Sequence, residues 1–508
     1  MSAITLKGSL DADAVAAMAH GARIEFDDSA LSAVAANRAV FEEILASGTP
    51  LYGITTGFGA LVSERVAPEF HRGLQVNLLR SHASGTGEEL SREVVRAALV
   101  IRLNSLLRAH SGVRPVVLER IREMLNHGYV PRVPRTGSLG ASGDLAPSAH
   151  AFLPLLGEGE VRDNMGHLID GAQALRELGL EPLVLEAKEG LALINGTHFM
   201  AGIGALLTVR VRVLLDVLDA VAAATIDALR GVLPAFDARV HRLRPLPGQE
   251  RSAANIRTAL AGSNRVHGPG GGRLQDAYSL RCVAQVHGAA REAFAFFARL
   301  IDVDLNAVTD NPLVFDDPPE VISAGNFHGQ SLALAFDTLR IALADLGSIS
   351  ERRTFRLVSP TLNGDLPAFL SPTPGFCSGY MVVQYAAAAL LSELRALAHP
   401  VSVDSVPTSD NQEDHVSMGM TAALMALDSV DRLERIVACE LLCAAQAIDV
   451  DPDMPGEAGA ALHAAVRRSV PMLVEDRPPG PDIERVLELI VDGTAARAIS
   501  DAHAGLAA

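Results

Sequence analysis

The second half of the chain contains long stretches in which apolar residues recur at helical spacing. In "QSLALAFDTLRIALADLGSISERR", apolar residues stand four, three, four and three positions apart, at Leu332, Phe336, Leu339, Leu343 and Leu346. This spacing gathers them into one stripe on an α-helix, and the stripe has to be covered by other parts of the protein. The pattern therefore predicts a packed bundle of long helices.

Helical patterns of the same kind occur at several other places. They predict helices over residues 28–47, 203–231, 377–398 and 415–447. Proline and glycine clusters, which mark loops, separate the later segments at 244–250, 267–273 and 371–376. Alternating runs typical of strands are short and rare. We therefore expect a mainly α protein with a mixed N-terminal domain, residues 1–200, and a long-helix bundle with C-terminal helices, residues 201–508.

Composition narrows the class of protein. The 508 residues include 43 Lys and Arg against 60 Asp and Glu, a net charge of −17, which argues against nucleic acid as a partner. The N-terminus carries no basic-then-apolar targeting segment. The apolar run "MVVQYAAAALLSELRAL" meets Glu393 and Arg395 before it reaches the length of about 20 residues that a membrane span needs. We expect a soluble protein with no membrane association.

The cysteines fit a reducing compartment. Four cysteines in a chain of this length are too few for a disulfide framework. Cys439 and Cys443 stand four apart on a predicted helix, but no further ligands accompany them, so we interpret them as small buried residues rather than a metal pair. We therefore expect a cytoplasmic location and no metal site.

Lysine is almost absent, which excludes two kinds of chemistry. Only Lys7 and Lys188 occur, and no Gly-Lys-Ser/Thr motif exists, so the chain has no P-loop. A pyridoxal-phosphate enzyme needs a Schiff-base lysine, for which Lys188 would be the only candidate outside the N-terminus. Lysine chemistry is therefore not the expected route.

The stretch "GSLGASGDLAPSAH", residues 137–150, places Ser142 between two very small residues. The order Gly-Ala-Ser-Gly-Asp does not match the nucleophile elbow G-x-S-x-G, and no basic partner stands next to the serine. Because Gly143 lacks a Cβ, the backbone can bend until its nitrogen reaches the carbonyl carbon of Ala141. Ring closure and loss of water would turn Ser142 into an electrophile. The tripeptide taken alone also fits an ordinary loop.

The surrounding motifs carry a family resemblance. The chain contains "LYGITTGFG" (51–59), "GSLGASGDLAP", "KEGLALINGT" (188–197), "QDAYSLR" (275–281), "GNFH" (325–328) and "NQEDHVSM" (411–418). Together and in this order they resemble the aromatic amino acid ammonia-lyase family, and the histidine lyases within it most closely. The resemblance extends over nearly the whole chain, and the motifs are specific as a set.

The resemblance implies a fold and a chemistry. It implies an ammonia-lyase/fumarase-like helical fold, a homotetramer with active sites shared among subunits, and no external cofactor. Ala141, Ser142 and Gly143 would form a 4-methylidene-imidazol-5-one group (MIO) autocatalytically. Its methylene would accept electron density from an amino-acid substrate and so help ammonia to leave. If a helix starts at Asp144, its free N–H groups would face the ring and favour negative charge there.

Family roles transfer to several further residues. Tyr52 would be the catalytic base, with its pKa lowered by its surroundings, although Tyr278 is a second candidate for removing the β-proton. Arg281 would bind the substrate carboxylate, and Gln275 and Tyr278 would lie on the same helical face. Asn195 would hold the oxygen of the prosthetic group or the substrate. Without the flanking matches, each of these residues would be interpreted as an ordinary loop or helix residue.

Substrate choice depends on a few positions. The resemblance implies that His82 and Glu413 contact the substrate ring and that Phe327 packs against it. A carboxylate suits an imidazole N–H, so the prediction is a histidine ammonia-lyase that forms trans-urocanate. Gln330 in "GNFHGQ" stands where histidine lyases often carry Glu, as it does in some aminomutases. A tyrosine or phenylalanine lyase or 2,3-aminomutase of the same family therefore remains the alternative.

Overall fold

The computed structural model describes residues 3–268 and 271–502. Two compact units are present, and each is made of several stretches of chain. The first unit comprises residues 1–209, 297–336 and 400–424, and the second comprises 210–296, 337–399 and 425–508. The expected division of the chain near residue 200 stays a prediction.

Short strands and medium-length helices make up most of the first unit. The strands are β1 (Ile4–Leu6), β2 (Ile24–Phe26), β3 (Thr86–Glu89), β4 (Val130–Pro131), β5 (Pro134–Thr136), β6 (Glu160–Arg162), β7 (Leu168–Asp170), β8 (Leu313–Asp316) and β9 (Pro319–Ile322). The shorter helices are α1 (Ala12–Ala19), α2 (Asp28–Ala46), α3 (His71–His82), α4 (Arg92–Leu107), α5 (Pro115–Asn126), α6 (Leu145–Phe152), α7 (Gly171–Glu177) and α8 (Glu189–Ile194). The strands form small sheets only. Strand β1 pairs with β2 in parallel, whereas the pairs β3 with β5, β4 with β6, β6 with β7, and β8 with β9 are antiparallel.

Helix α4 lies at the centre of the first unit. Every residue from Val94 to Leu107 is buried, as expected for a helix surrounded by protein on all sides. Its two buried arginines are Arg96 and Arg102. Arg96 donates to the carbonyls of Met18 and Leu125, so backbone oxygens stabilise its buried charge.

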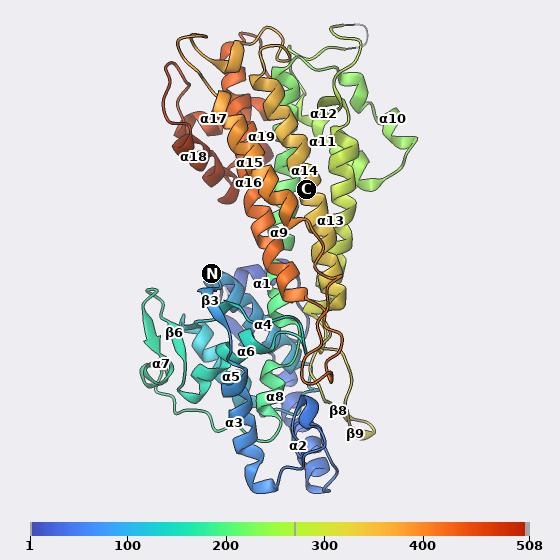
Figure 1. The fold of residues 1–508 in the computed structure, drawn as a ribbon, viewed down its shortest axis with the longest axis vertical. Coiled ribbons are helices and arrows are strands. Elements are labelled where there is room, and N and C mark those ends of the chain that lie inside the picture. The colour runs from blue at the N-terminus through green and yellow to red at the C-terminus, as the bar shows by residue number, and fades with distance from the viewer. Residues whose placement is uncertain (1–2, 269–270, 503–508) are drawn as a thin grey trace. The chain divides into compact units, whose positions relative to one another are not determined.

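Long helices run alongside one another in Figure 1. They are α9 (His198–Ala228), α13 (Val283–Leu305), α14 (Gln330–Val358), α15 (Met381–Leu397) and α16 (Gly419–Val450). The second unit also contains α10 (Ala238–Arg242), α11 (Pro247–Ala259), α12 (Tyr278–Arg281), α17 (Glu457–Ser469), α18 (Gly480–Val491) and α19 (Thr494–Ala502). The five apolar residues of the α14 stripe are each at most 1% exposed. The prediction of a mainly α protein with a bundle of long helices is confirmed.

Buried ion pairs join the long helices of the second unit. Arg353 on α14 donates through Nε and Nη2 to the two carboxylate oxygens of Glu440 on α16, at 2.6 and 2.9 Å. Thr225 on α9 donates to the same carboxylate at 2.8 Å. His287 on α13 also makes a buried hydrogen bond to Asp219 on α9, at 2.7 Å. These contacts fix which helix faces meet, because a buried charge is tolerated only where it is paired.

Several helix ends differ from the predicted ones. Helix α9 begins at His198 rather than 203, because a buried carboxylate described below accepts its first N–H groups. Helix α15 begins at Met381 rather than 377. The N–H groups of Ser378 and Gly379 donate to Asp476, and Gly379 has a φ of +59°, which no helix accommodates.

The predicted loops are partly correct. Residues 371–376 form a loop, but α11 begins at Pro247, within the cluster 244–250, because proline suits the first turn of a helix. Of the glycine-rich cluster 267–273, residues 269–270 lie outside the described residues. Cys439 and Cys443 are fully buried, as predicted. Among the helices of residues 3–268 and 271–502, none has both the length and the apolarity needed to cross a membrane.

Candidate active site

The Ala-Ser-Gly tripeptide lies in a tight loop between β5 and α6. Ser142 has a φ of +50° and Gly143 a φ of +84°, a region that a serine rarely adopts. A Cβ added to Gly143 would lie 2.2 Å from the carbonyl oxygen of Gly196, so no residue larger than glycine fits. The backbone is therefore sharply bent at Ser142 and Gly143, as closure of a ring between the Gly143 nitrogen and the Ala141 carbonyl carbon would require.

Gly196 forms two backbone hydrogen bonds with this loop. Its N–H donates to the carbonyl oxygen of Ser142 at 3.2 Å, and its carbonyl accepts from the N–H of Asp144 at 2.8 Å. Gly196 has a φ of +128°, and an added Cβ would lie 2.5 Å from Oγ1 of Thr309. Sequence reasoning named the neighbouring Asn195 but missed this glycine, although the "NGT" motif contains it.

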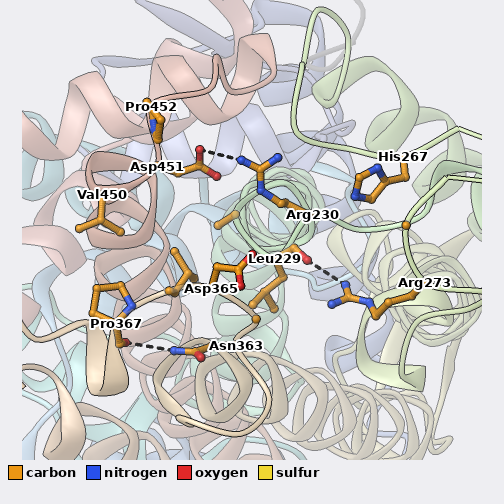
Figure 2. Close-up of a pocket in the computed structure, with 14 residues that line it drawn as sticks. Leu229, Arg230, His267, Arg273, Asn363, Asp365, Pro367, Val450, Asp451 and Pro452 are labelled. Atoms are coloured by element: carbon orange, nitrogen blue, oxygen red, sulfur yellow. Dashed lines mark hydrogen bonds and ion pairs between the residues drawn. The ribbon is translucent and has the colours of Figure 1, made fainter.

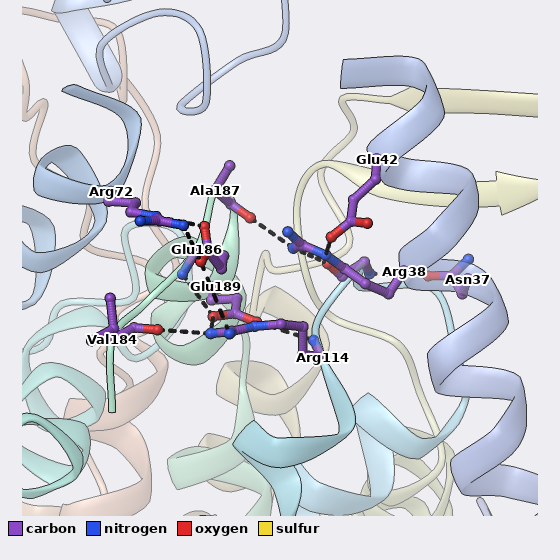
Figure 3. Close-up of polar contacts among 10 residues, drawn as sticks. Asn37, Arg38, Glu42, Arg72, Arg114, Val184, Glu186, Ala187 and Glu189 are labelled. Carbon is purple, nitrogen blue, oxygen red and sulfur yellow. Dashed lines mark hydrogen bonds and ion pairs between the residues drawn. The ribbon is translucent and has the colours of Figure 1, made fainter. Parts of the chain in front are cut away.

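The side chain of Asn195 is buried and anchored on a separate segment. Its Nδ2 donates to the carbonyl oxygen of Asn311 at 2.7 Å. The helix before it, α8, begins in a charged network that Figure 3 shows. Arg114 donates to both carboxylate oxygens of Glu189, at 2.8 and 2.7 Å, and Arg38 donates to the carbonyl of Ala187 at 3.0 Å. This network fixes the segment that leads to Asn195.

Asp144 caps a different helix from the one that it precedes. Helix α6 begins at Leu145, and the Asp144 side chain makes no capping bond to it. Instead its Oδ2 accepts from the N–H groups of Phe199 and Met200 in α9, at 2.9 and 3.0 Å. Its own N–H is bonded to the carbonyl of Gly196, and the helix begins at Leu145, one residue after the start on which the expectation of free N–H groups facing the ring depended.

Charge near the loop is incompletely paired. Burial raises the pKa of Asp144 to about 7. In the described part of the chain, Asp144 Oδ1, His198 Nδ1 and the side-chain nitrogens of Arg102 have no hydrogen-bond partner, although Arg102 Nη2 lies 3.9 Å from the carboxylate of Asp310. Burial also lowers the pKa of His198 well below its usual value, so this imidazole is neutral. The loop therefore lies beside buried polar atoms whose hydrogen-bonding capacity is not filled by other groups of the described protein.

In the first unit, Tyr52 and His82 each lie close to Glu413. The Glu413 carboxylate is close enough to raise the pKa of both other side chains, although in each case burial is the larger influence. The Tyr52 hydroxyl accepts the N–H of Gly59 at 3.0 Å. Burial raises the pKa of Tyr52, so the expectation of a lowered pKa is wrong for this chain: the neighbouring charge is negative rather than positive.

His82 has a defined tautomer. Its Nδ1 lies 2.9 Å from the carbonyl oxygen of Leu78, and a carbonyl can only accept, so Nδ1 carries the proton. Burial lowers the pKa of His82 and favours the neutral ring. Its Nε2 is therefore an acceptor, suited to an N–H donor on a ligand.

Glu413 is held by a residue that sequence reasoning missed. Oγ1 of Thr408 donates to Oε2 of Glu413 at 2.8 Å, and the backbones of the two residues are paired. The next residue, Ser409, accepts the N–H of Ala60 at 3.0 Å. Ser409 has a φ of +49°, in a left-handed run that no glycine relieves. This short segment positions both Glu413 and the chain that follows Tyr52, and its sequence carries no motif that would have shown it.

The remaining predicted residues are divided between the units. Phe327 is half-buried in the turn between β9 and α14, in the first unit. Gln275, Tyr278 and Arg281 belong to the second unit. The Arg281 guanidinium lies over the Tyr278 ring at 4.5 Å, so the predicted shared helical face is confirmed for this pair. Gln275 precedes α12 and is exposed, so it is not on that helix.

Comparisons with known proteins span nearly the whole chain. The family model of the aromatic amino acid lyases matches residues 10–468. The histidine ammonia-lyase of Symbiobacterium thermophilum is 50% identical over 501 residues, which cover 98% of this chain and 98% of that protein. A tyrosine aminomutase from Streptomyces globisporus superimposes with a TM-score of 0.94, at 38% identity and 98% coverage of both chains. A histidine ammonia-lyase from Trypanosoma cruzi gives a TM-score of 0.91 at 40% identity, covering 99% of this chain and 96% of that one.

Proposed function

The chain belongs to the aromatic amino acid lyase family, and from this premise we propose that it is a histidine ammonia-lyase. The reaction converts L-histidine into trans-urocanate and ammonia. Support comes from relatives named histidine ammonia-lyase, which are 46–50% identical over most of the chain. The observation in the structure that carries the choice of histidine is the polar pair His82 and Glu413 beside Tyr52.

The loop fits the prosthetic group that the family implies. We infer that Ala141, Ser142 and Gly143 condense into MIO, with no external cofactor. The left-handed Ser142 and the absence of room for a Cβ at Gly143 support this inference. When formed, the group would supply an electrophilic methylidene carbon. The N–H of Gly196 already donates to the Ser142 carbonyl, the oxygen on which negative charge would collect, and Asn195 is fixed beside it.

His82 and Glu413 would bind the imidazole ring of histidine. With Oε2 held by Thr408, Glu413 keeps Oε1 for a ring N–H. The His82 Nε2 lone pair offers a second acceptor. A neutral imidazole has one N–H and would satisfy one of these acceptors, whereas a phenyl ring would satisfy neither, which is unfavourable for polar groups shielded from water. Phe327 would pack against the ring.

Arg281 would bind the substrate carboxylate, with Gln275 as a neighbouring amide. Its Nε donates to the carbonyl of Asp276 at 2.9 Å, which fixes the guanidinium and leaves its Nη atoms to form a two-pronged contact. Tyr52 and Tyr278 are the candidate bases. Because Tyr52 is neutral at physiological pH, it would act by accepting the β-proton only as its own proton moves to another acceptor.

We also propose a cytoplasmic homotetramer with shared active sites. Tyr278 is 71% exposed, which is high for a side chain that contacts a substrate. Exposed apolar residues also lie on the long helices, namely Val303 on α13, Ile341 on α14, and Val382 and Tyr385 on α15. Apolar side chains in such positions suit subunit contacts.

A tyrosine or phenylalanine lyase or 2,3-aminomutase is the second candidate. The high TM-score to a tyrosine aminomutase and Gln330 at the start of α14 favour it. Purified protein should be supplied separately with L-histidine, L-tyrosine and L-phenylalanine, and the unsaturated acids followed by absorbance. We expect urocanate from histidine. No urocanate, with coumarate, cinnamate or a β-amino acid from another substrate, would replace the first proposal by the second.

A further inference from the structure

The cavity of about 520 Å³ in the second unit, which Figure 2 shows, has its arginines already paired. Arg230 donates to Asp451 and Asp453, at 3.0 and 2.6 Å. Arg273 donates to Asp276 at 3.0 Å. Because these pairs neutralise both guanidinium groups, the cavity indicates no particular ligand. A buried glutamine in the first unit has a more specific arrangement.

Gln75 lies on α3 and uses both ends of its side-chain amide to hold other segments. The residue is 0% exposed. Its Nε2 donates to the carbonyl oxygen of Gly53 at 3.1 Å, and its Oε1 accepts the N–H of Leu191, the third residue of α8, at 3.1 Å. A carbonyl can only accept and an N–H can only donate, so these two partners fix which way round the amide lies. Gly53 directly follows Tyr52, and α8 ends directly before Asn195, so one amide joins two segments that carry predicted site residues.

Two glycines allow this glutamine to approach its partners. A Cβ added to Gly190 would lie 2.6 Å from the backbone carbonyl oxygen of Gln75, so α3 and α8 meet through their backbones and lie side by side in Figure 1. Gly53 has a φ of +66°, and an added Cβ would lie 2.6 Å from the Phe58 ring and 2.8 Å from the Leu191 side chain. In such close packing, the loss of either hydrogen bond would leave a shielded backbone group without a partner.

The position of Tyr52 is fixed at two points. Its hydroxyl accepts the N–H of Gly59 at 3.0 Å, and the backbone next to it is held by the bond from Gln75 to Gly53. Gly59 belongs to the same short stretch of chain, so its bond shapes the turn. The Gln75 bond places the turn against α3, on which His82 stands seven residues later and therefore on the same face. Gln75 thus sets where Tyr52 lies relative to a predicted substrate contact.

We propose that Gln75 is a positioning residue for the reaction, acting through the backbone at Tyr52. This inference rests on the proposed function, because it gives Tyr52 a part in removing the β-proton. The two hydrogen bonds of Gln75 go to backbone atoms rather than to the proposed substrate contacts. Loss of the bond to Gly53 should therefore lower kcat and leave KM nearly unchanged.

Gln75→Glu tests the donor in this bond, since the variant keeps the shape of the side chain and adds a titratable group. A protonated carboxyl can donate to the Gly53 carbonyl while its other oxygen accepts from Leu191. An ionised carboxylate cannot donate and would repel that carbonyl, so burial should raise the pKa of the introduced group. We expect the kcat of the variant, divided by that of the unchanged enzyme, to fall at least about tenfold between about pH 6 and about pH 9. KM should change by less than about threefold.

Gln446→Glu is the matched control. Gln446 on α16 is also 0% exposed, and its amide holds both the carbonyl and the N–H of Leu473, at 3.1 and 3.0 Å. Its kcat ratio should be independent of pH, and circular dichroism at both pH values checks that each variant stays folded. A constant ratio in Gln75→Glu, or an equal fall in both variants, would overturn the proposal.

Gln75→Met keeps the proposal testable if the buried carboxyl prevents folding. This uncharged side chain of similar length should lower kcat at least about tenfold at every pH, whereas Gln446→Met should not. An unchanged kcat in Gln75→Met would overturn the proposal. If the unchanged enzyme converts tyrosine or phenylalanine rather than histidine, the same ratios are measured with that substrate.

Amide hydrogen exchange of the peptide that contains residues 51–59 needs no substrate. Exchange should be faster in Gln75→Met than in the unchanged enzyme and in Gln446→Met, because the turn has lost its bond to α3. Equal exchange in all three proteins would overturn the proposal. Faster exchange in Gln75→Met, together with no histidine turnover by the unchanged enzyme, would retain the placement of the turn and reject the proposed function instead.

Discussion

Two buried carboxylates, Asp219 in the second unit and Asp144 in the first, have opposite environments. In the second unit, burial alone would raise the pKa of Asp219, but the hydrogen bond from His287 and the charge of Arg291 lower it to about 2. In the first unit, Asp144 accepts only from two backbone N–H groups, and burial raises its pKa to about 7. Both carboxylate oxygens of Asp219 have side-chain partners, whereas Asp144, beside the tripeptide, keeps one carboxylate oxygen without a hydrogen-bond partner in the described part of the chain.

This difference indicates that the loop with the tripeptide keeps unpaired buried groups at a cost in folding stability. A helix bundle gains by pairing every buried charge, because each pair fixes one arrangement of helices. A loop that has to bend and react keeps strained backbone and unpaired polar atoms, held in place by surrounding structure. Changes in the first unit should therefore alter chemistry first, and changes in the second unit should alter stability first.

The largest effect should come from Ser142→Ala. Without the serine, the electrophile cannot form, and we expect turnover of histidine to fall by at least about a thousandfold while the protein stays folded. Steady-state assay and circular dichroism measure the two properties. Ser9→Ala, at an exposed position, is the control. Turnover within tenfold of the unchanged enzyme would show that the tripeptide is not the reactive group.

Gly196→Ala should come next. The added Cβ would meet Thr309, and the alanine would have to adopt a φ of +128°. We therefore expect the hydrogen bond from the N–H of residue 196 to the Ser142 carbonyl to be lost. We expect activity to fall by about a hundredfold or more, since the loop is no longer held for ring closure. Gly179→Ala separates strain from contact, because Gly179 also has positive φ but its Cβ would meet nothing within 4 Å. Similar losses in both variants would refute the assigned role of Gly196.

A smaller effect is expected at Thr408. Replacing Thr408 with Val removes the hydrogen bond that fixes Glu413 and should raise the KM for histidine by about tenfold with little change in kcat. Thr408→Ser retains the hydroxyl and should restore the original KM. If Val and Ser behave alike, Thr408 acts through packing, and its hydroxyl does not position Glu413.

The pH dependence of stability should differ between the units. The folded-state pKa of Asp144 is raised, so its contribution is favourable at low pH and is lost as pH rises from about 4 towards 7. Asp144→Asn should remove this loss, worth a few kcal/mol, and flatten the fall in Tm between pH 5 and 8. The pKa of Asp219 is lowered, so Asp219→Asn should reduce Tm by a similar amount at every pH in that range. An unchanged slope in Asp144→Asn would contradict the comparison.

The sequence predicted the helices well where one face is apolar over many turns. The α14 stripe is an example, because its spacing fixes both the helix and its buried face. Helix ends were less predictable, since they depend on distant groups such as Asp476 at the start of α15 and Asp144 at the start of α9.

The candidate site was predicted through its motifs rather than its contacts. Sequence reasoning identified Ser142, His82 and Glu413, and the structure brings His82 and Tyr52 each close to Glu413. It did not identify Thr408, because a threonine in a loop has no pattern until its partner is known. The direction of the Tyr52 pKa was also wrong, since it depends on burial and on a carboxylate 361 positions along the chain.

Intact-mass and peptide mass spectrometry of purified, folded protein tests the central claim most directly. The peptide that contains residues 141–143 should be lighter than its sequence requires by the mass of two water molecules, and the same peptide from Ser142→Ala should not show this loss. A peptide of full mass in folded, histidine-converting enzyme would contradict the account.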